Sequence, residues 1–241
     1  MTISFVGSTS SNAANGANVT ADLTNITGLA EDDYVIFAYG IGGFENYTMS
    51  LVSPTGSWTT HSTLYQDDVR DSNLGVFSKV MGATVDTAVT GDGGATSGRG
   101  VACVAMAFRG VDTTTPQDVT RTEAQSADSY RPDPPSITYS TSGAAVVIIG
   151  AGAHVRAGHT TTWPTGYTTN PLHDTGDSST DISVAVAYNL SPSTPENPGV
   201  ITFDDADDAT YSWCAVTMAL RPSGGVSIIP LIQHHRRQMQ G

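Results

Sequence analysis

Short apolar runs separated by turn-forming residues recur along the whole chain. Residues 101–108 and 144–153 are continuous apolar runs, the second rich in glycine and alanine. Runs of this length without polar alternation are typical of strands covered on both faces. Val184, Val186 and Tyr188 alternate with smaller residues, which predicts a strand with one principal core face. Because no segment has a long helical period, the pattern predicts an all-β fold, a jelly-roll-like β-sandwich.

Similar segments recur at a nearly constant spacing, which predicts two pseudo-repeated halves. The spacing stays between 109 and 112 residues at every match. The matched pairs are 54–60 with 164–169, 34–38 with 145–149, 74–77 with 184–187, Thr90 and Asp92 with Thr202 and Asp204, and 104–109 with 216–221. A period near 110 residues is too long for a solenoid repeat or a propeller blade. It fits two copies of a half-sandwich.

The same pattern sets the expected organisation of the chain. We expect a first β half over residues 1–113, a linker over 114–133 and a second β half over 134–222. The remaining residues, 223–241, begin with Ser-Gly-Gly, a flexible joint, and are expected to form a C-terminal extended arm.

The net charge of the chain excludes several classes of partner. Ten Lys and Arg residues stand against 23 Asp and Glu residues, a net charge of −13. A surface that follows a phosphate backbone needs clustered cations, so nucleic acid and anionic membranes are not expected as partners. The amino terminus lacks the pattern of a secretory signal, and no apolar run reaches the length of a membrane helix. Cys103 and Cys214 lie inside apolar runs and are expected to be buried free thiols, with a disulfide as the alternative.

Candidate chemistry is sparse. The chain contains no nucleophile elbow, zinc-protease motif, P-loop or dinucleotide fingerprint. His61, His154, His159 and His173 are scattered among loop-like residues and are expected on the surface. The acidic run 204–208 is expected to be a solvated turn, with a calcium site as the alternative. We therefore expect a protein that is not an enzyme and has no cofactor or metal.

Three aromatic residues lie near the two copies of a Pro-Thr-Gly element. They are Trp58, Trp163 and Tyr167. Aromatic faces on loops can stack on sugars, whereas aromatics that enter strands usually pack a core. We expect a packing role for these residues, with glycan contact as the alternative.

The predicted arm differs in chemistry from the rest of the chain. An apolar group is followed by a basic one: Ile228, Ile229, Pro230, Leu231, Ile232, then His234, His235, Arg236 and Arg237. Each large aliphatic side chain releases about 1.5–3 kcal/mol on full burial, and ordering costs about 1–2 kcal/mol per residue. Docking therefore needs both the apolar group and charge-assisted bonds from the arginines. We expect the arm to dock onto a partner or onto other copies of the chain.

Several strand patterns carry a resemblance to a known group of proteins. They are the entry at 28–36, the strand at 76–79, the run at 105–112 and the closing strand at 215–222. On these segments, residues 20–222 resemble β-sandwich accessory proteins of tailed-phage virions. The resemblance implies a non-enzymatic structural protein, most simply a capsid decoration or cement protein on the outer shell. The alternative that it implies is a receptor-binding or carbohydrate-binding module of a tail fibre or baseplate.

The resemblance also implies partners and a location. The expected partner is the major capsid protein or another virion protein, and the expected location is the virion after assembly in the host cytoplasm. Lattice decoration tends to sit on symmetry axes, so we expect a homo-oligomer, with a trimer favoured. The resemblance does not extend to the arm, whose docking role rests on the physical argument alone.

Overall fold

Strands from the two halves of the chain form separate sheets in the computed structural model. The structure describes residues 1–14, 16–54, 56–94, 99–129, 131–153, 160–168, 173–175, 181–204 and 211–224. The arm residues 225–241 lie outside this part of the chain.

The first half contains a large and a small antiparallel sheet. The order of the large sheet is β1 (Ser4–Ala13), β8 (Val101–Arg109), β3 (Tyr34–Gly43), β6 (Asp71–Val80) and β5 (Thr59–Gln66). The small sheet has the order β2 (Val19–Asp22), β7 (Ala88–Gly91) and β4 (Leu51–Ser53), and the 3-10 helix η1 (Leu23–Asn25) follows β2.

The second half repeats this division. Its large sheet has the order β12 (His173–Thr175), β13 (Ile182–Asn189), β10 (Ala145–Ala153), β15 (Trp213–Leu220) and β9 (Thr122–Ser126). Its small sheet pairs β11 (Thr160–Thr162) with β14 (Thr202–Asp204).

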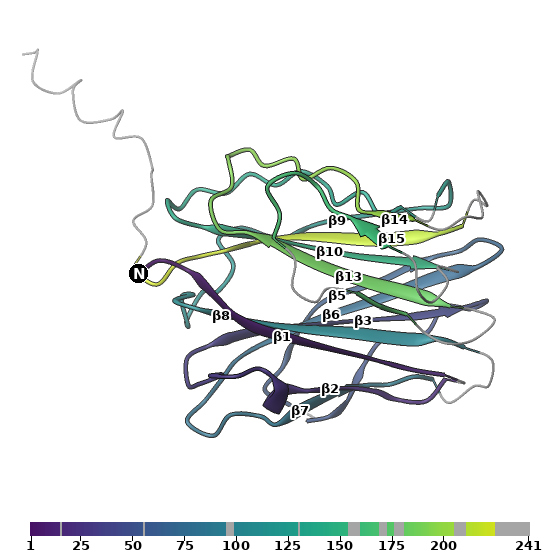
Figure 1. Ribbon diagram of the computed structural model, residues 1–241, viewed down its shortest axis with the longest axis horizontal. Helices are drawn as coiled ribbons and strands as arrows, with labels where there is room; N and C mark the ends of the chain where they lie inside the picture. The colour runs from purple at the N-terminus through teal and green to yellow at the C-terminus, as the bar shows by residue number, and fades with distance from the viewer. Residues whose placement is uncertain are drawn as a thin grey trace, which may run out of the picture.

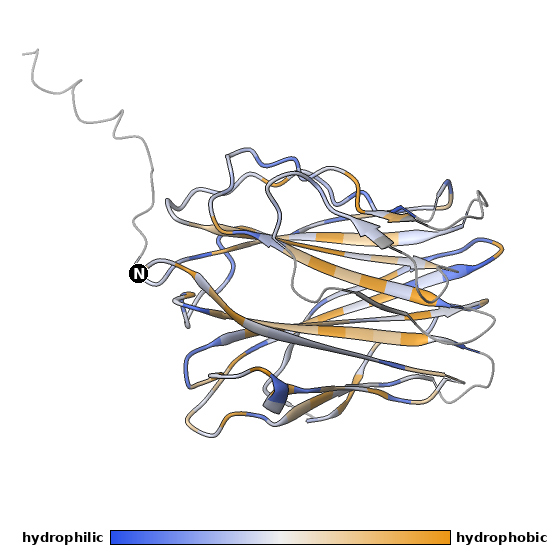
Figure 2. Cartoon of the chain, in the orientation of Figure 1, coloured by the Kyte–Doolittle hydropathy of each residue, from blue (hydrophilic) through white to orange (hydrophobic). Residues whose placement is uncertain are grey.

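The four sheets stack as layers, with the two large sheets in the middle (Figure 1). Apolar residues are concentrated along the strands of these two sheets (Figure 2). A central core, with Val104 and Val147 among its members, fills the space between the large sheets. A second core lies between the first large sheet and its small sheet, and a third lies between the second large sheet and β14. The predicted all-β sandwich is confirmed.

Each large sheet is therefore covered on both faces, as the continuous apolar runs predicted. In β8, Val104 and Met106 face the central core while Cys103 and Ala105 face the second core. In the strand around Val184 the larger side chains, Val184, Val186 and Tyr188, share the central-core face, as expected for a principal core face. The alanines between them are also buried, in the third core.

The two large sheets share one strand order. The run β8-β3-β6 corresponds to β15-β10-β13, and the flanking strands β1 and β5 correspond to β9 and β12. This is the arrangement that two pseudo-repeated halves require, and the repeat itself stays a prediction. One boundary needs correction, because the segment 114–133 is more than a linker: its strand β9 forms an edge of the second large sheet.

The two large sheets approach closely because a glycine, which has no side chain, lies at their contact. A Cβ atom on Gly40 of β3 would lie 2.9 Å from Val184 Cγ2 and 3.0 Å from Ile182 Cγ1, both on β13 of the other sheet. The carbonyl oxygen of Asn73 would be only 3.2 Å away. Glycine at this position lets the halves meet without displacing the branched side chains opposite.

The first and last described residues meet at one end of the sandwich. The amino group of Met1 donates to the carbonyl oxygen of Ser223 at 2.6 Å, and the Ser223 N–H donates to the carbonyl oxygen of Gly110 at 2.8 Å. An isolated bridge joins Val111 to Pro222. The backbone at Ser223, close to the end of the described residues, is therefore fixed against the first half.

Cys103 and Cys214 are buried thiols that form no disulfide, which confirms that interpretation. Burial raises the pKa of the Cys214 thiol to about 12, so this thiol stays protonated and unreactive at neutral pH. No helix in the described part of the chain is long and apolar enough to cross a membrane.

Substitution of Gly40 by alanine should separate the central layers locally. We expect Gly40→Ala to lower the free energy of unfolding by about 1–3 kcal/mol, the usual cost of overpacking a core. Gly82→Ala is the control, because a Cβ atom there meets nothing within 4 Å. Chemical denaturation of the two variants would contradict this account if both changed stability equally.

Candidate functional site: a polar cavity between the halves

A cavity of about 530 Å³ lies where the ends of three first-half strands face a segment bound to the second half. Its lining is rich in hydroxyl groups, from Ser57, Thr59, Ser78, Thr113, Thr114 and Thr115. Tyr34, His61 and Gln117 add a phenol, an imidazole and an amide, and Val80 and Pro116 supply apolar surface. Its size falls in the range of about 300–1,000 Å³ that is usual for small-molecule sites.

The threonine rim is held by the second half. Backbone hydrogen bonds join Asp112 to Arg221 and Asp118 to Ala219, so the segment that carries the rim runs along the end of β15. The carboxylate of Asp112 accepts the N–H groups of Thr114 and Thr115, each at 2.9 Å. These bonds fix the turn, so the rim hydroxyls project from a rigid support.

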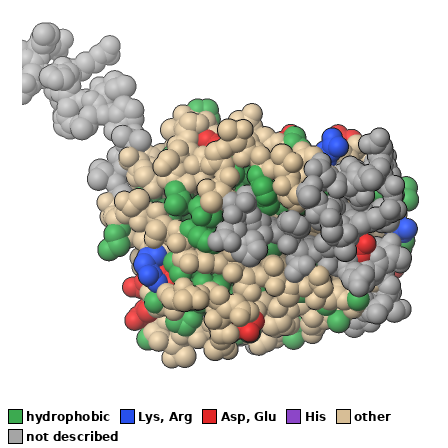
Figure 3. Space-filling view, in the orientation of Figure 1, with side chains coloured by type: hydrophobic (Ala, Val, Ile, Leu, Met, Phe, Trp, Pro, Cys, Tyr) green, Lys and Arg blue, Asp and Glu red, His purple; other side chains and the backbone are tan. Residues whose placement is uncertain are grey.

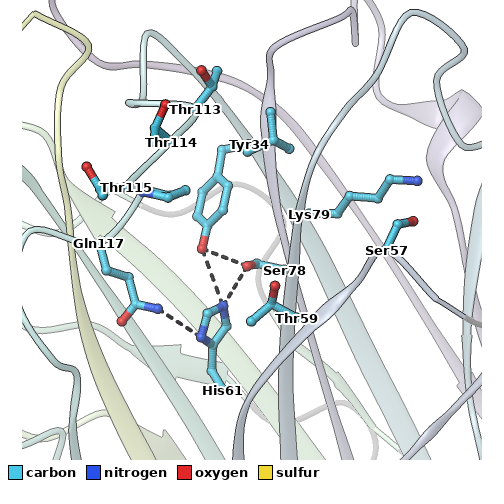
Figure 4. Close-up of a pocket in the computed structure, with 12 residues that line it drawn as sticks. Tyr34, Ser57, Thr59, His61, Ser78, Lys79, Thr113, Thr114, Thr115 and Gln117 are labelled. Carbon is cyan, nitrogen blue, oxygen red and sulfur yellow. Dashed lines mark hydrogen bonds between the residues drawn. The ribbon is translucent and has the colours of Figure 1, made fainter.

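Four side chains at the base of the cavity form one hydrogen-bonded chain. Tyr34 Oη donates to Ser78 Oγ at 2.7 Å, and Ser78 Oγ lies 2.6 Å from His61 Nε2. His61 Nδ1 lies 2.8 Å from the amide nitrogen of Gln117. These side chains point toward one another from β3, β6, β5 and the rim segment (Figure 4). The network therefore links the first half, across the cavity, to the segment that is bound to the second half.

A β-bulge places His61 in this chain. Thr60 pairs with Phe77 and Ser62 pairs with Val76, which leaves His61 as an extra residue in β5. An extra residue shifts the alternation of the strand and can aim a side chain toward a new face. The expectation that His61 is a surface histidine in a loop is therefore wrong: it is half-buried on a strand and hydrogen-bonded on both ring nitrogens.

The chain is uncharged at neutral pH. Burial, with a smaller contribution from the positive charge of Arg121, lowers the pKa of His61 to about 4. Burial raises the pKa of Tyr34 to about 12, against a smaller opposing effect of its bond to Ser78. Both groups therefore carry no charge in the network beneath the cavity.

Nearby charges are compensated by their own partners. Lys79 Nζ lies 2.8 Å from both carboxylate oxygens of Asp86, and the indole N–H of Trp58 donates to the same carboxylate at 2.9 Å. Lys79 extends away from the histidine (Figure 4). On the other side, Arg121 Nε and Glu123 Oε1 are 2.7 Å apart.

The geometry permits one catalytic interpretation, which its electrostatics disfavour. A serine hydroxyl 2.6 Å from an imidazole nitrogen is at the distance of a nucleophile and its general base. The amide N–H of Gln117 donates to Nδ1, however, so the proton of the neutral ring lies on Nε2, which donates to Ser78 and cannot accept the serine proton. A base is most effective when its pKa lies near the working pH, and a pKa of about 4 makes His61 a weak one. The amide of Gln117 also cannot stabilise an imidazolium as a carboxylate does. The arrangement is better suited to holding a neutral polar molecule.

The three aromatic residues lie against the cores. Trp58 packs edge-on against Phe37 with ring centroids 6.4 Å apart, beside the second core. Trp163 is half-buried against the central and third cores. Tyr167 is 9% exposed, and its hydroxyl donates to Glu196 at 3.2 Å. Glycan contact by these residues stays a prediction.

The other expected sites lie mostly outside the described residues. This holds for the arm residues Ile228 to Arg237, for His154 and His159, and for 205–208 of the acidic run. In the part of the chain that the structure describes, no group of three or more His, Cys, Asp or Glu side chains is arranged to hold a metal ion. Comparison with protein-family models, curated proteins and solved structures finds no match for the chain.

The lowered pKa of His61 predicts a stability that falls on acidification. Between the usual pKa of 6.5 and about 4, the unfolded chain binds a proton on this ring that the folded chain does not. We expect the wild type to lose of order 1 kcal/mol more stability than His61→Gln between pH 7 and pH 4, a value reduced for partial exposure of the ring.

Thermal or urea unfolding over this pH range measures the difference. The interval from pH 7 to pH 8 is the internal control, because His61 is neutral there in both states. Parallel stability curves down to pH 4 would contradict the assignment of this histidine.

Proposed function

We propose that the protein is a non-enzymatic structural component of a tailed-phage virion, a decoration or cement protein on the outer shell. In this proposal the layered body is a rigid exposed module, and the arm, residues 223–241, attaches it to the major capsid protein or another virion protein. Copies of the chain associate as a homo-oligomer, with a trimer favoured by the symmetry of shells.

The observation that carries the proposal is the fixed point at which the arm begins. Ser223 is bonded on both sides, to Met1 and to Gly110, at one end of the sandwich. A docking segment that begins from a fixed backbone position keeps the body close to its attachment point and limits the orientations that the body can take.

Charge contrast supports the same proposal. Without Arg236 and Arg237 the net charge of the chain changes from −13 to −15. On the face drawn in Figure 3, charged side chains lie singly or in small groups among neutral polar ones. A cationic, apolar arm on an acidic body favours attachment by the arm and disfavours contact between bodies.

Removal of residues 225–241 tests the proposal. We expect the truncated protein to keep the melting temperature of the full chain, because the cut preserves the bonds of Ser223. Its occupancy should fall at least tenfold on particles assembled by the phage that carries the gene, measured by quantitative mass spectrometry of purified virions.

A full-length variant distinguishes the contribution of the arm's basic group to attachment from that of its apolar group. Arg236→Glu with Arg237→Glu reverses the charge and leaves the apolar group intact, so partial loss is expected. Full occupancy of the truncated protein would refute attachment by the arm. Absence of the wild-type protein from purified particles would refute a structural role in the virion.

A further inference from the structure

The cavity between the halves has the chemistry of a binding site that the proposed structural function does not use. Its polar groups converge from the first half and from the segment 113–117 that is bound to the second half, and its most buried members, Tyr34 and Ser78, are each only 2% exposed. Burying such groups is costly unless they form hydrogen bonds. Here the network beneath the cavity satisfies them, which leaves the rim hydroxyls to meet a ligand.

The lining selects against charged ligands. Lys79, which lines the cavity, is paired with Asp86, and the nearby Arg121 and Arg221 are paired with Glu123 and Asp118, so an anion would have to break an ion pair to reach a cation. A ligand charge placed against the buried phenol and serine would lose its hydration without gaining an opposite charge. The favoured ligand is therefore neutral.

The same lining favours a ligand with many hydroxyl groups. A serine or threonine hydroxyl both donates and accepts, and six of them line the cavity beside an amide and a neutral imidazole. Adjacent hydroxyls of a sugar ring also donate and accept, so they complement such a lining in either direction. The partly exposed side chains of Val80 and Pro116 supply apolar surface for the C–H groups of the sugar.

We propose that this cavity binds a neutral saccharide unit, held by the rim threonines and Gln117 above the Tyr34–Ser78–His61 network. Ser78 and His61 act as positioning residues: their bonds orient the amide of Gln117 and the phenol of Tyr34. The site is separate from the surfaces of Trp163 and Tyr167, which belong to the other half. It is also independent of the arm, so this inference and the proposed function can fail separately.

Saturation-transfer NMR on the full-length protein tests the site. The probes are glucose, galactose, mannose, rhamnose and N-acetylglucosamine, with glucuronic acid and glucose 6-phosphate as charged counterparts. We expect saturable transfer to at least one neutral sugar and none to the charged pair. Affinity should stay constant between pH 6 and pH 8, because His61 and Tyr34 remain neutral there.

Two conservative variants locate the binding. Thr114→Val and Gln117→Leu keep the side-chain volume and remove hydrogen-bonding groups, so each should weaken the affinity about three- to tenfold. Thr162→Val on β11 and Trp163→Ala are the matched controls and should bind as the wild type does. Removal of residues 225–241 should likewise leave sugar binding unchanged.

Each contrary result overturns the inference. Absence of transfer to every neutral sugar would remove the ligand class, and stronger binding of the charged probes would remove the selection against charge. Binding that survives Thr114→Val and Gln117→Leu but disappears in Trp163→Ala would move the site to the other half. Circular dichroism of each variant shows that the fold is retained.

Discussion

Burial of both large sheets on both faces is the constraint on which the rest of the structure depends. Their central strands must present mainly apolar side chains to both faces, and the facing surfaces must approach closely. Small residues make this possible: Gly40 faces Ile182 and Val184, and Gly150 lies under Pro132, where an added Cβ would come within 2.7 Å of the proline ring. The outer small sheets are then required, because without them the second faces of the large sheets would be exposed to water.

The boundary of this apolar interior is closed by polar pairs at equivalent places in the two halves. Arg109 at the end of β8 lies 2.7 Å from Asp33, and Arg221 after the end of β15 lies 3.2 Å from Asp118. Both carboxylates have no exposed side-chain surface, so each depends on its arginine. Along the neighbouring edges, Ser62 of β5 donates to Glu123 of β9 at 2.6 Å. The cavity lies next to this edge, where the polar boundary opens toward solvent.

Hydrophobic patterning predicted the central strands β8 and β10 and their coverage on both faces, because both follow from local composition. It did not predict β9, since residues 122–126 carry few apolar groups and pair only because the edge of β15 is available. The cavity was missed for a related reason. Tyr34, His61, Ser78 and Gln117 are far apart in sequence and meet through strand register. The bulge at His61 was the one local feature that could have indicated the cavity. Its neighbours are Thr60 and Ser62, both polar, so the sequence shows no break in the alternation of apolar and polar residues there.

The contact between Met1 and Ser223 means that the strands of this fold could follow one another in a different order along the chain. Since the amino group and the carbonyl are 2.6 Å apart, a short peptide could join the two backbone positions and new termini could open in a distant hairpin. The layered body is thus compatible with circular permutation. In such a permutant the segment after residue 224 could be attached at another corner of the body. The body would then take a different orientation relative to the partner that binds this segment.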